Sequence, residues 1–168
     1  MEENKHKHLQ ELLEGFTTVM LITRDGDRDH ARPMAVAGTE GPTIIWFVTA
    51  DDSTMAEEIC RNSFAAVTAQ SKAKYLALSG HAELVRDRAK LDELWSDAWT
   101  VRFPKGKNDP SLYLIRLKVD DAEYWDDEGA SGIRYVFEAA KALVMGETPH
   151  PEAERHARIV PSRGRPAV

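Results

Sequence analysis

The sequence has a single cysteine, Cys60, among its 168 residues. One thiol cannot form an internal disulfide bridge, so a buried apolar core must hold the fold, and we expect a reducing compartment, the cytoplasm. No stretch reaches the ~18 consecutive apolar residues of a membrane-spanning helix, and residues 1–10 are polar, unlike a signal peptide. These absences predict a cytoplasmic protein that does not interact with a membrane.

Positive charge and catalytic signatures are also scarce. Lys and Arg number 22 against 28 Asp and Glu, and the resulting formal net charge of −6 disfavours nucleic acid as a partner. The chain has no P-loop, no G-x-G-x-x-G, no G-x-S-x-G and no C-x-x-C motif. His150 and His156 are too far apart for a helical zinc pair, and we interpret His30 and His81 as ordinary strand histidines, so no metal site is expected.

The most informative stretch is Pro42–Asn62. Thr43–Val48 is β-branched and aromatic with no charge, which predicts a strand buried on both faces. Asp51, Asp52 or Ser53 can then cap a helix that follows directly. A strand that leads into a helix N-terminus presents free N–H groups to a bound anion, although most such turns bind nothing.

The helix after this turn is predicted by apolar residues at helical spacing. Met55, Ile59 and Cys60 form its expected apolar face, so Cys60 is interpreted as a packed and unreactive thiol. A second helix is predicted to begin at Asp87 and to continue at least to Trp99, because its large apolar residues share one face. We expect the tryptophans at that end, Trp95 and Trp99, to pack in a core or subunit interface.

The remaining pattern predicts a mainly β protein with flanking helices. Pro33 interrupts its strand and predicts an edge or a bulge, and Gly80 predicts a bulge or the close approach of another backbone. Hairpin connections favour an antiparallel barrel over a doubly wound sheet. We predict one domain over residues 1–146 and a disordered tail over 147–168. The expected strands cover residues 16–23, 30–37, 43–48, 64–69, 75–85 and 112–119, the last of which resumes at 122–125, and two further helices cover residues 2–14 and 133–145.

Two residues point to ligand chemistry without defining it. Arg32 precedes the strand-breaking Pro33, and an arginine there can pair with a carboxylate or clamp a phosphate. Trp125 follows a strand and precedes an acidic turn, where it can cap the barrel or stack on a planar ligand.

Five segments, taken in order, carry a family resemblance. Together they resemble the general stress protein 26 branch of the pyridoxamine 5′-phosphate oxidase-like, FMN-binding split-barrel superfamily. The resemblance implies a six-stranded antiparallel split β-barrel that forms a homodimer, with two FMN molecules in clefts between the subunits. The segments are ARPMAV (31–36), IWFVTADDS (45–53), LSGHAELVRDR (78–88), FPKGKNDP (103–110) and AEYWD (122–126).

The resemblance also implies which residues would contact the flavin. It implies three groups of flavin-binding residues. The first lies in the second strand, along the flavin; the second lies in the third strand, along the ring and the ribityl chain; and the third lies at the start of the helix, at the phosphate. Tyr75 stands where the oxidases carry a glutamine, and Trp125 resembles a tryptophan that closes the site from the partner chain. The three groups are Arg32, Pro33 and Met34; Phe47, Val48 and Thr49; and Ser53 and Thr54, with Lys74, Trp99 and Lys105 as weaker candidates.

The sequence departs from the family pattern at the phosphate turn. Ser53-Thr54-Met55 stands where relatives carry basic residues, so FMN binding would need a compensating cation such as Arg32 or Lys74. The arginine and histidine with which the oxidases hold pyridoxine phosphate are not recognisable in 132–138, so vitamin B6 synthesis is not expected.

We therefore expect an FMN-binding stress protein that acts as a flavin-dependent oxidoreductase on an unidentified substrate. The alternatives are a non-enzymatic flavin carrier or sensor, and a flavin-free dimeric interaction module. A third alternative keeps the same barrel but replaces FMN with a haem or a deazaflavin as the ligand.

Overall fold

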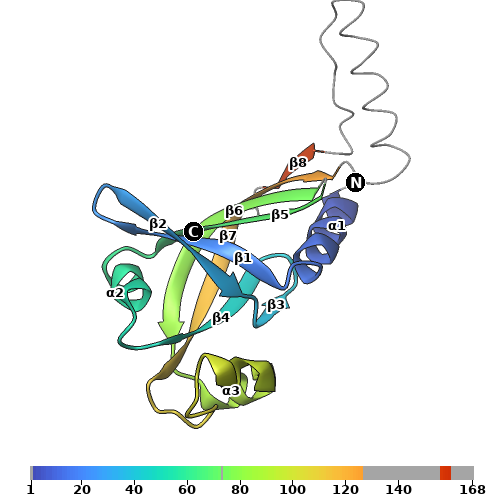
Figure 1. Ribbon diagram of the computed structural model, residues 1–168. Helices are drawn as coiled ribbons and strands as arrows, with labels where there is room; N and C mark the ends of the chain where they lie inside the picture. The colour runs from blue at the N-terminus through green and yellow to red at the C-terminus, as the bar shows by residue number, and fades with distance from the viewer. Residues whose placement is uncertain (1, 73, 127–155, 160–168) are drawn as a thin grey trace, which may run out of the picture.

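A computed structural model describes residues 2–72, 74–126 and 156–159 (Figure 1). The described strands are β1 (Thr18–Asp25), β2 (Arg28–Ala35), β3 (Gly38–Glu40), β4 (Ile44–Ala50), β5 (Phe64–Ser71), β6 (Lys74–Val85), β7 (Leu112–Asp126) and β8 (His156–Ile159). The described helices are α1 (Glu2–Glu14), α2 (Thr54–Arg61), α3 (Arg88–Leu94) and the 3₁₀ helix η1 (Asp97–Val101).

The strands form one antiparallel sheet in the order β2-β1-β5-β6-β7-β4-β3, and β8 also pairs with β7. The two ends of this order, β2 and β3, are separated in sequence by only Val36 and Ala37. The Val36 N–H donates to Thr17 O (3.0 Å) and the Ala37 N–H donates to Trp46 O (2.8 Å), so this short link joins the two edges of a strongly coiled sheet. The predicted mainly β, antiparallel class with flanking helices is confirmed.

The predicted number of six strands is wrong. The six expected strands correspond to β1, β2, β4, β5, β6 and β7. The additional strand β3 forms between the expected strands 30–37 and 43–48, because the chain beyond Ala37 stays extended and pairs with β4. The other addition, β8, lies within the segment 147–168 for which we predict disorder. The rest of that segment and the helix predicted over 133–145 lie outside the described residues.

Both strand irregularities predicted from the sequence are explained by the sheet. Pro33 lies in β2, which is an edge strand that pairs only with β1. The N–H that proline lacks is therefore not needed for pairing with a second strand. At Gly80 the register between β6 and β7 shifts. A Cβ atom at this position would lie 1.9 Å from the Lys118 carbonyl oxygen, so only glycine fits the close approach of the two backbones.

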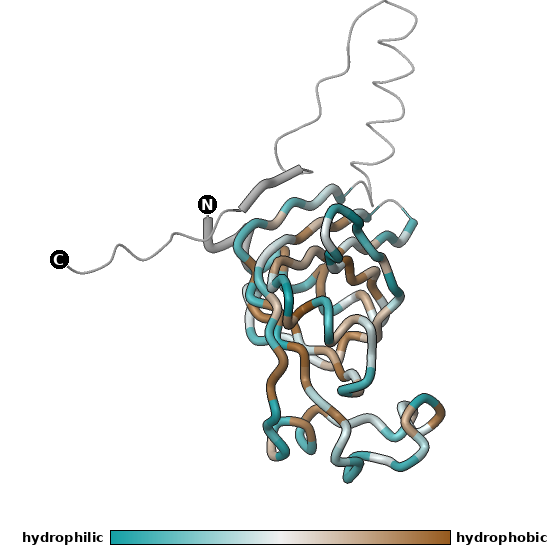
Figure 2. Tube along the Cα trace, turned by 90° about the vertical axis from the view of Figure 1, so that its left-hand side faces the viewer, coloured by the Kyte–Doolittle hydropathy of each residue, from teal (hydrophilic) through white to brown (hydrophobic). Residues whose placement is uncertain are grey.

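The strand β4 is buried on both faces, as predicted, and its two faces contribute to different cores. Ile45 and Phe47 belong to the main core inside the coiled sheet, whereas Trp46 and Val48 belong to a second cluster. Hydrophobic residues are spread through the body of the trace, and hydrophilic residues gather at many of its outer turns (Figure 2). Opposite faces of one strand thus contribute to the main core and to the cluster on which α3 packs.

The helices cover three separate sides of the sheet (Figure 1). The helix α1, as predicted, is amphipathic and contributes Leu9, Leu12 and Leu13 to the main core. The helix predicted from Asp87 to Trp99 is interrupted, because Trp95 has extended backbone angles (φ −61°, ψ 134°) and the chain resumes as η1. This break lets Trp95 and Trp99, both partly buried, pack against the second cluster.

The interpretation of Cys60 as a packed thiol is wrong, because its side chain is exposed. At 3.6 residues per turn, Cys60 lies about 140° around the helix from Met55. The buried face of α2 instead consists of Met55, Ala56, Glu58 and Ile59.

Candidate functional site

The end of β4 leads into α2 through a tightly hydrogen-bonded turn. Ser53 is the N-cap: its hydroxyl accepts from the Ala56 N–H (3.1 Å) and hydrogen-bonds with the Thr49 hydroxyl (2.9 Å). The Glu57 N–H donates to Ser53 O. The amides of Thr54 and Met55 have no acceptor within the described part of the chain, so they remain available to an anion.

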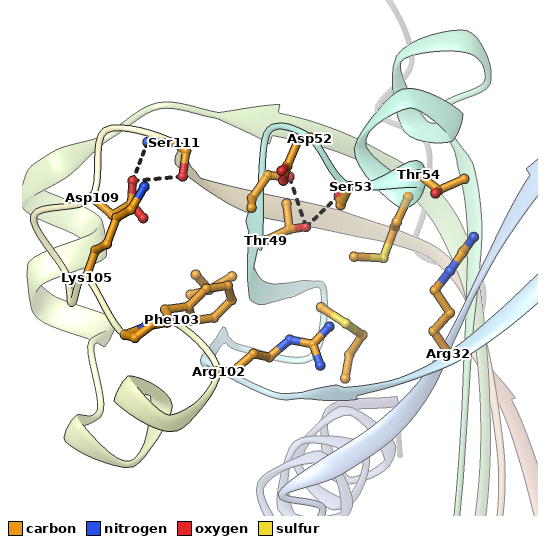
Figure 3. A pocket seen from close by; sticks show the side chains of 15 residues that line it. Arg32, Thr49, Asp52, Ser53, Thr54, Arg102, Phe103, Lys105, Asp109 and Ser111 are labelled. Carbon is orange, nitrogen blue, oxygen red and sulfur yellow. Dashed lines mark hydrogen bonds between the residues drawn. The ribbon is translucent and has the colours of Figure 1, made fainter.

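A pocket of about 540 Å³ lies at this turn (Figure 3). Its volume is within the roughly 300–1,000 Å³ that is typical of small-molecule sites. One side is formed by α2 and the end of β4, and the opposite side by residues 102–111. Six of the flavin residues implied by the resemblance line it: Arg32, Met34, Val48, Thr49, Ser53 and Thr54.

Arg32 is held at the pocket by a buried carboxylate. Its guanidinium makes a bidentate pair with Glu58 (Nη1–Oε2 and Nη2–Oε1, both 2.9 Å) and also donates to Thr23 Oγ1 (2.9 Å). Glu58 is fully buried and also accepts from Thr23 Oγ1 (2.5 Å). His30 Nδ1 lies 2.6 Å from Glu58 Oε1. A carboxylate or a phosphate was expected as the partner of Arg32, and Glu58 of the same chain supplies the carboxylate.

The same network sets the ionisation of Glu58. Hydrogen bonds from Arg32, and then from Thr23 and His30, outweigh burial and lower the Glu58 pKa from its ordinary value of 4.5 to about 2. Arg32 uses three of its five N–H groups in these contacts. Two N–H groups are left for a ligand, and the guanidinium that carries them is fixed in orientation.

The opposite side of the pocket carries two more cations. Arg102 points into the pocket in Figure 3, and its side chain has no hydrogen bond or ion pair within the described residues. Lys105 lies near Asp109, whose pKa is lowered mainly by hydrogen bonds from Ser111 and further by Lys105. The pocket therefore combines one fixed and one unpaired arginine.

Other predicted site residues lie elsewhere. The Phe47 side chain is fully buried in the main core, and Pro33 and Trp99 line a smaller neighbouring pocket. Tyr75 and Trp125 are cross-strand neighbours of β6 and β7 and do not line either pocket of their own chain. Lys105 lines the main pocket, whereas Lys74 pairs in register with Asp126.

Two residues of the site were missed from the sequence. Glu58 is three residues after Met55 and therefore on the buried face of α2, where a carboxylate signals a buried partner. Arg102 carries no comparable signal, because it follows a broken helix and reaches the pocket only through the tertiary fold. The missing basic residue of the phosphate turn, Met55, is a core side chain that is only 4% exposed.

Within residues 2–72, 74–126 and 156–159, no group of three or more His, Cys, Asp or Glu side chains is arranged to hold a metal ion. None of the described helices is long and apolar enough to cross a membrane.

The sheet and its pocket define a class of protein. The model of the pyridoxamine 5′-phosphate oxidase-like family matches residues 4–150, and the chain belongs to this family. Within it, similar solved structures place the chain in the general stress protein 26 branch.

Three solved structures illustrate the relationship. A protein assigned as general stress protein 26 from Jannaschia sp. CCS1 is 28% identical with a TM-score of 0.72, and the match covers 95% of this chain and 99% of that chain. The general stress FMN/FAD binding protein of Xanthomonas citri is 30% identical (TM-score 0.65; 77% and 93% covered). General stress protein 26 of Bacillus anthracis, at 20% identity, shares the fold (TM-score 0.65; 71% and 92% covered). No curated protein matches the sequence.

Proposed function

We propose that this protein binds FMN in the pocket between β4, α2 and residues 102–111, and that it is a flavin-dependent oxidoreductase. The observation that carries the proposal is a pair of unsatisfied helix N-terminal amides beside a fixed arginine in one pocket. The FMN/FAD binding relative from Xanthomonas citri supports a flavin as the ligand.

The phosphate is assigned to the N-terminus of α2. The Thr54 and Met55 amides and the Thr54 hydroxyl offer three donors, and the helix dipole adds a favourable field. The two remaining N–H groups of Arg32 supply charge-assisted donors. This set offsets the absent basic residues of the turn, and Arg32 is one of the two cations, with Lys74, that the sequence suggests as compensation.

The flavin ring is assigned to the apolar part of the pocket, where Met34, Val48 and Phe103 form the wall. These side chains exclude water from a planar ring and orient it relative to the fixed phosphate. A bound flavin supplies the electron transfer, so the protein needs no catalytic acid or base of its own to begin it.

We further propose that the protein is a homodimer. The outward side chains of β1, β5 and β6 form a face with no charge at its centre, and two of its large residues, Met20 and Tyr75, are 38% and 39% exposed. The central small residues Ala66 and Ala77 would let a second sheet approach closely. We assign this face to a second copy of the chain. The resemblance assigns Tyr75 and Trp125 to the flavin, and these residues need a partner chain to reach a pocket.

The phosphate assignment is tested by Thr54→Glu. A carboxylate at the first helical position favours the α2 dipole, so folding is retained, but it repels a phosphate. We expect FMN affinity, measured by quenching of flavin fluorescence, to fall more than about tenfold. The control Thr54→Gln has the same size without the charge and should bind FMN much more tightly than Thr54→Glu. Equal affinity in the two variants would contradict the assignment.

The dimer is tested by Ala66→Arg at the centre of the uncharged face. Sedimentation velocity should show dimers for the original protein and monomers for this variant, because a desolvated unpaired charge strongly opposes association. Arg28→Gln, in the β1–β2 hairpin, is a control that should stay dimeric. A monomeric original protein would refute the dimer while leaving the pocket open to direct titration.

A further inference from the structure

A second, smaller pocket adjoins the proposed flavin site. It has a volume of about 190 Å³. Four residues line both pockets, so the two share a common wall: Met34, Val48, Arg102 and Phe103. A molecule in the smaller pocket would therefore lie beside the ligand of the larger one.

The walls of the smaller pocket are mainly apolar and partly aromatic. Trp99 and Phe103 supply two rings, and Pro33 adds a rigid apolar surface. Trp95 packs against both rings, with centroid distances of 5.7 Å to Trp99 and 6.5 Å to Phe103. The aromatic walls are thus held by the second core, and are already in place for a ligand.

The volume limits the size of that ligand. An apolar cavity of about 150 Å³ is enough to hold benzene. The available 190 Å³ therefore accommodates one six-membered ring with a small substituent, and nothing as large as a flavin.

The charge of the pocket limits the ligand further. Arg102 is the only charged residue among those that line it. Unlike Arg32, it has no carboxylate partner within the described residues, so its planar guanidinium is available for a bidentate contact. Apolar walls with one unpaired arginine suit a flat molecule that carries a single carboxylate.

We infer that the smaller pocket is the substrate subsite of this protein and that it takes a small aromatic monocarboxylate, bound through Arg102 next to the flavin. The inference rests on the proposed function, because the pocket is a substrate subsite only if a flavin binds beside it. The binding of the carboxylate itself requires only the residues of the smaller pocket.

Benzoate is the probe, with benzamide as its neutral counterpart of the same shape. Binding to the flavin-free protein is followed by tryptophan fluorescence, because Trp99 lines the pocket. Binding to the FMN-loaded protein is followed by the shift it causes in flavin absorbance. We expect benzoate to saturate both signals and benzamide to bind about tenfold more weakly.

Arg102→Gln identifies the group that recognises the carboxylate. We expect it to weaken benzoate about tenfold and to leave benzamide unchanged. Arg28→Gln removes an exposed arginine distant from the pocket and should change neither. Benzoate binding that is insensitive to Arg102→Gln, or no benzoate binding to a protein that takes up FMN, would overturn the inference while the flavin proposal stands.

A failure of the flavin proposal can also be distinguished from a failure of the carboxylate pocket. A protein that ignores FMN but binds benzoate in an Arg102-dependent way would refute the flavin site and support the carboxylate pocket. If Arg102→Gln weakens FMN and not benzoate, Arg102 serves the flavin phosphate and the inference is overturned.

Discussion

Two arginines in the same pocket, Arg32 and Arg102, are held in opposite ways. Arg32 is fixed by two hydrogen bonds to a fully buried Glu58 and by a third to Thr23. Arg102 follows a 3₁₀ helix and has no side-chain partner within the part of the chain that the structure describes. One arginine is part of the folded framework, and the other is available to whatever enters the pocket.

The difference matches two kinds of ligand. A group that stays bound, such as a cofactor phosphate, is best met by donors that are already ordered, because little entropy is lost on binding. A group that must enter and leave is better met by a cation that keeps its hydration until the ligand arrives. This reasoning supports the two proposals above, in which Arg32 binds the cofactor phosphate and Arg102 binds the substrate carboxylate.

The largest effect is expected for Glu58→Gln. The change leaves Arg32 beside a neutral amide in a buried site, and breaking a buried ion pair in this way costs about 3–5 kcal/mol. Urea denaturation at pH 7 measures the loss of unfolding free energy. Glu57→Gln, at the exposed neighbouring position, should cost less than about 1 kcal/mol. Similar losses in both variants would mean that Arg32 is not fixed by Glu58.

The contribution of the Arg32–Glu58 ion pair should also appear in the pH dependence of the unfolding free energy. The folded-state pKa of Glu58 is lowered from 4.5 to about 2, so its contribution is complete above pH 4.5 and is lost as the pH falls toward 2. The size of that contribution is about 3 kcal/mol. Denaturation at a series of pH values should give a steeper acid loss in the original protein than in Glu58→Gln. Parallel curves would contradict the assignment.

A smaller effect is expected for Arg32→Lys. Lysine keeps the charge but lacks the planar fork that pairs with both Glu58 oxygens. We expect a stability loss of about 1–2 kcal/mol and about tenfold weaker FMN binding. Arg61→Lys in α2, where the arginine is exposed, is the matched control. Unchanged FMN affinity in Arg32→Lys would remove Arg32 from the phosphate site.

The smallest effect on stability is expected for Arg102→Gln. Its side chain stabilises no described group, so the unfolding free energy should change by less than about 0.5 kcal/mol. Thermal and urea denaturation measure this change. A loss as large as that of Arg32→Lys would erase the proposed difference between the two arginines.

Local sequence patterns were sufficient where local chemistry decides the structure. The uncharged run in β4 predicted burial on both faces. Pro33 predicted an edge or a bulge and lies in an edge strand, and Gly80 predicted a bulge or a close backbone approach and lies where the register between β6 and β7 shifts. Ser53 was among the three expected caps of α2. The strand-to-helix turn at the centre of the site was therefore predictable from the sequence.

Contacts between distant residues were not predictable in the same way. Arg32 and Glu58 are 26 residues apart, and the packing of α2 against β1 and β6 brings them together. The break at Trp95 also has a tertiary origin, since the helical spacing continues in the sequence while the second core draws both tryptophans inward. The role proposed for Tyr75 and Trp125 requires a second chain, and contacts between two chains leave no local pattern in one sequence.

The most direct test of the account compares FMN with riboflavin, which has the same ring and no phosphate. The flavin-free protein is titrated with each, and binding is read from the quenching of flavin fluorescence. The account predicts one FMN per chain and riboflavin binding at least about tenfold weaker, because the Thr54 and Met55 amides and Arg32 act on the phosphate. Equal affinity for the two flavins, or no uptake of FMN, would contradict it.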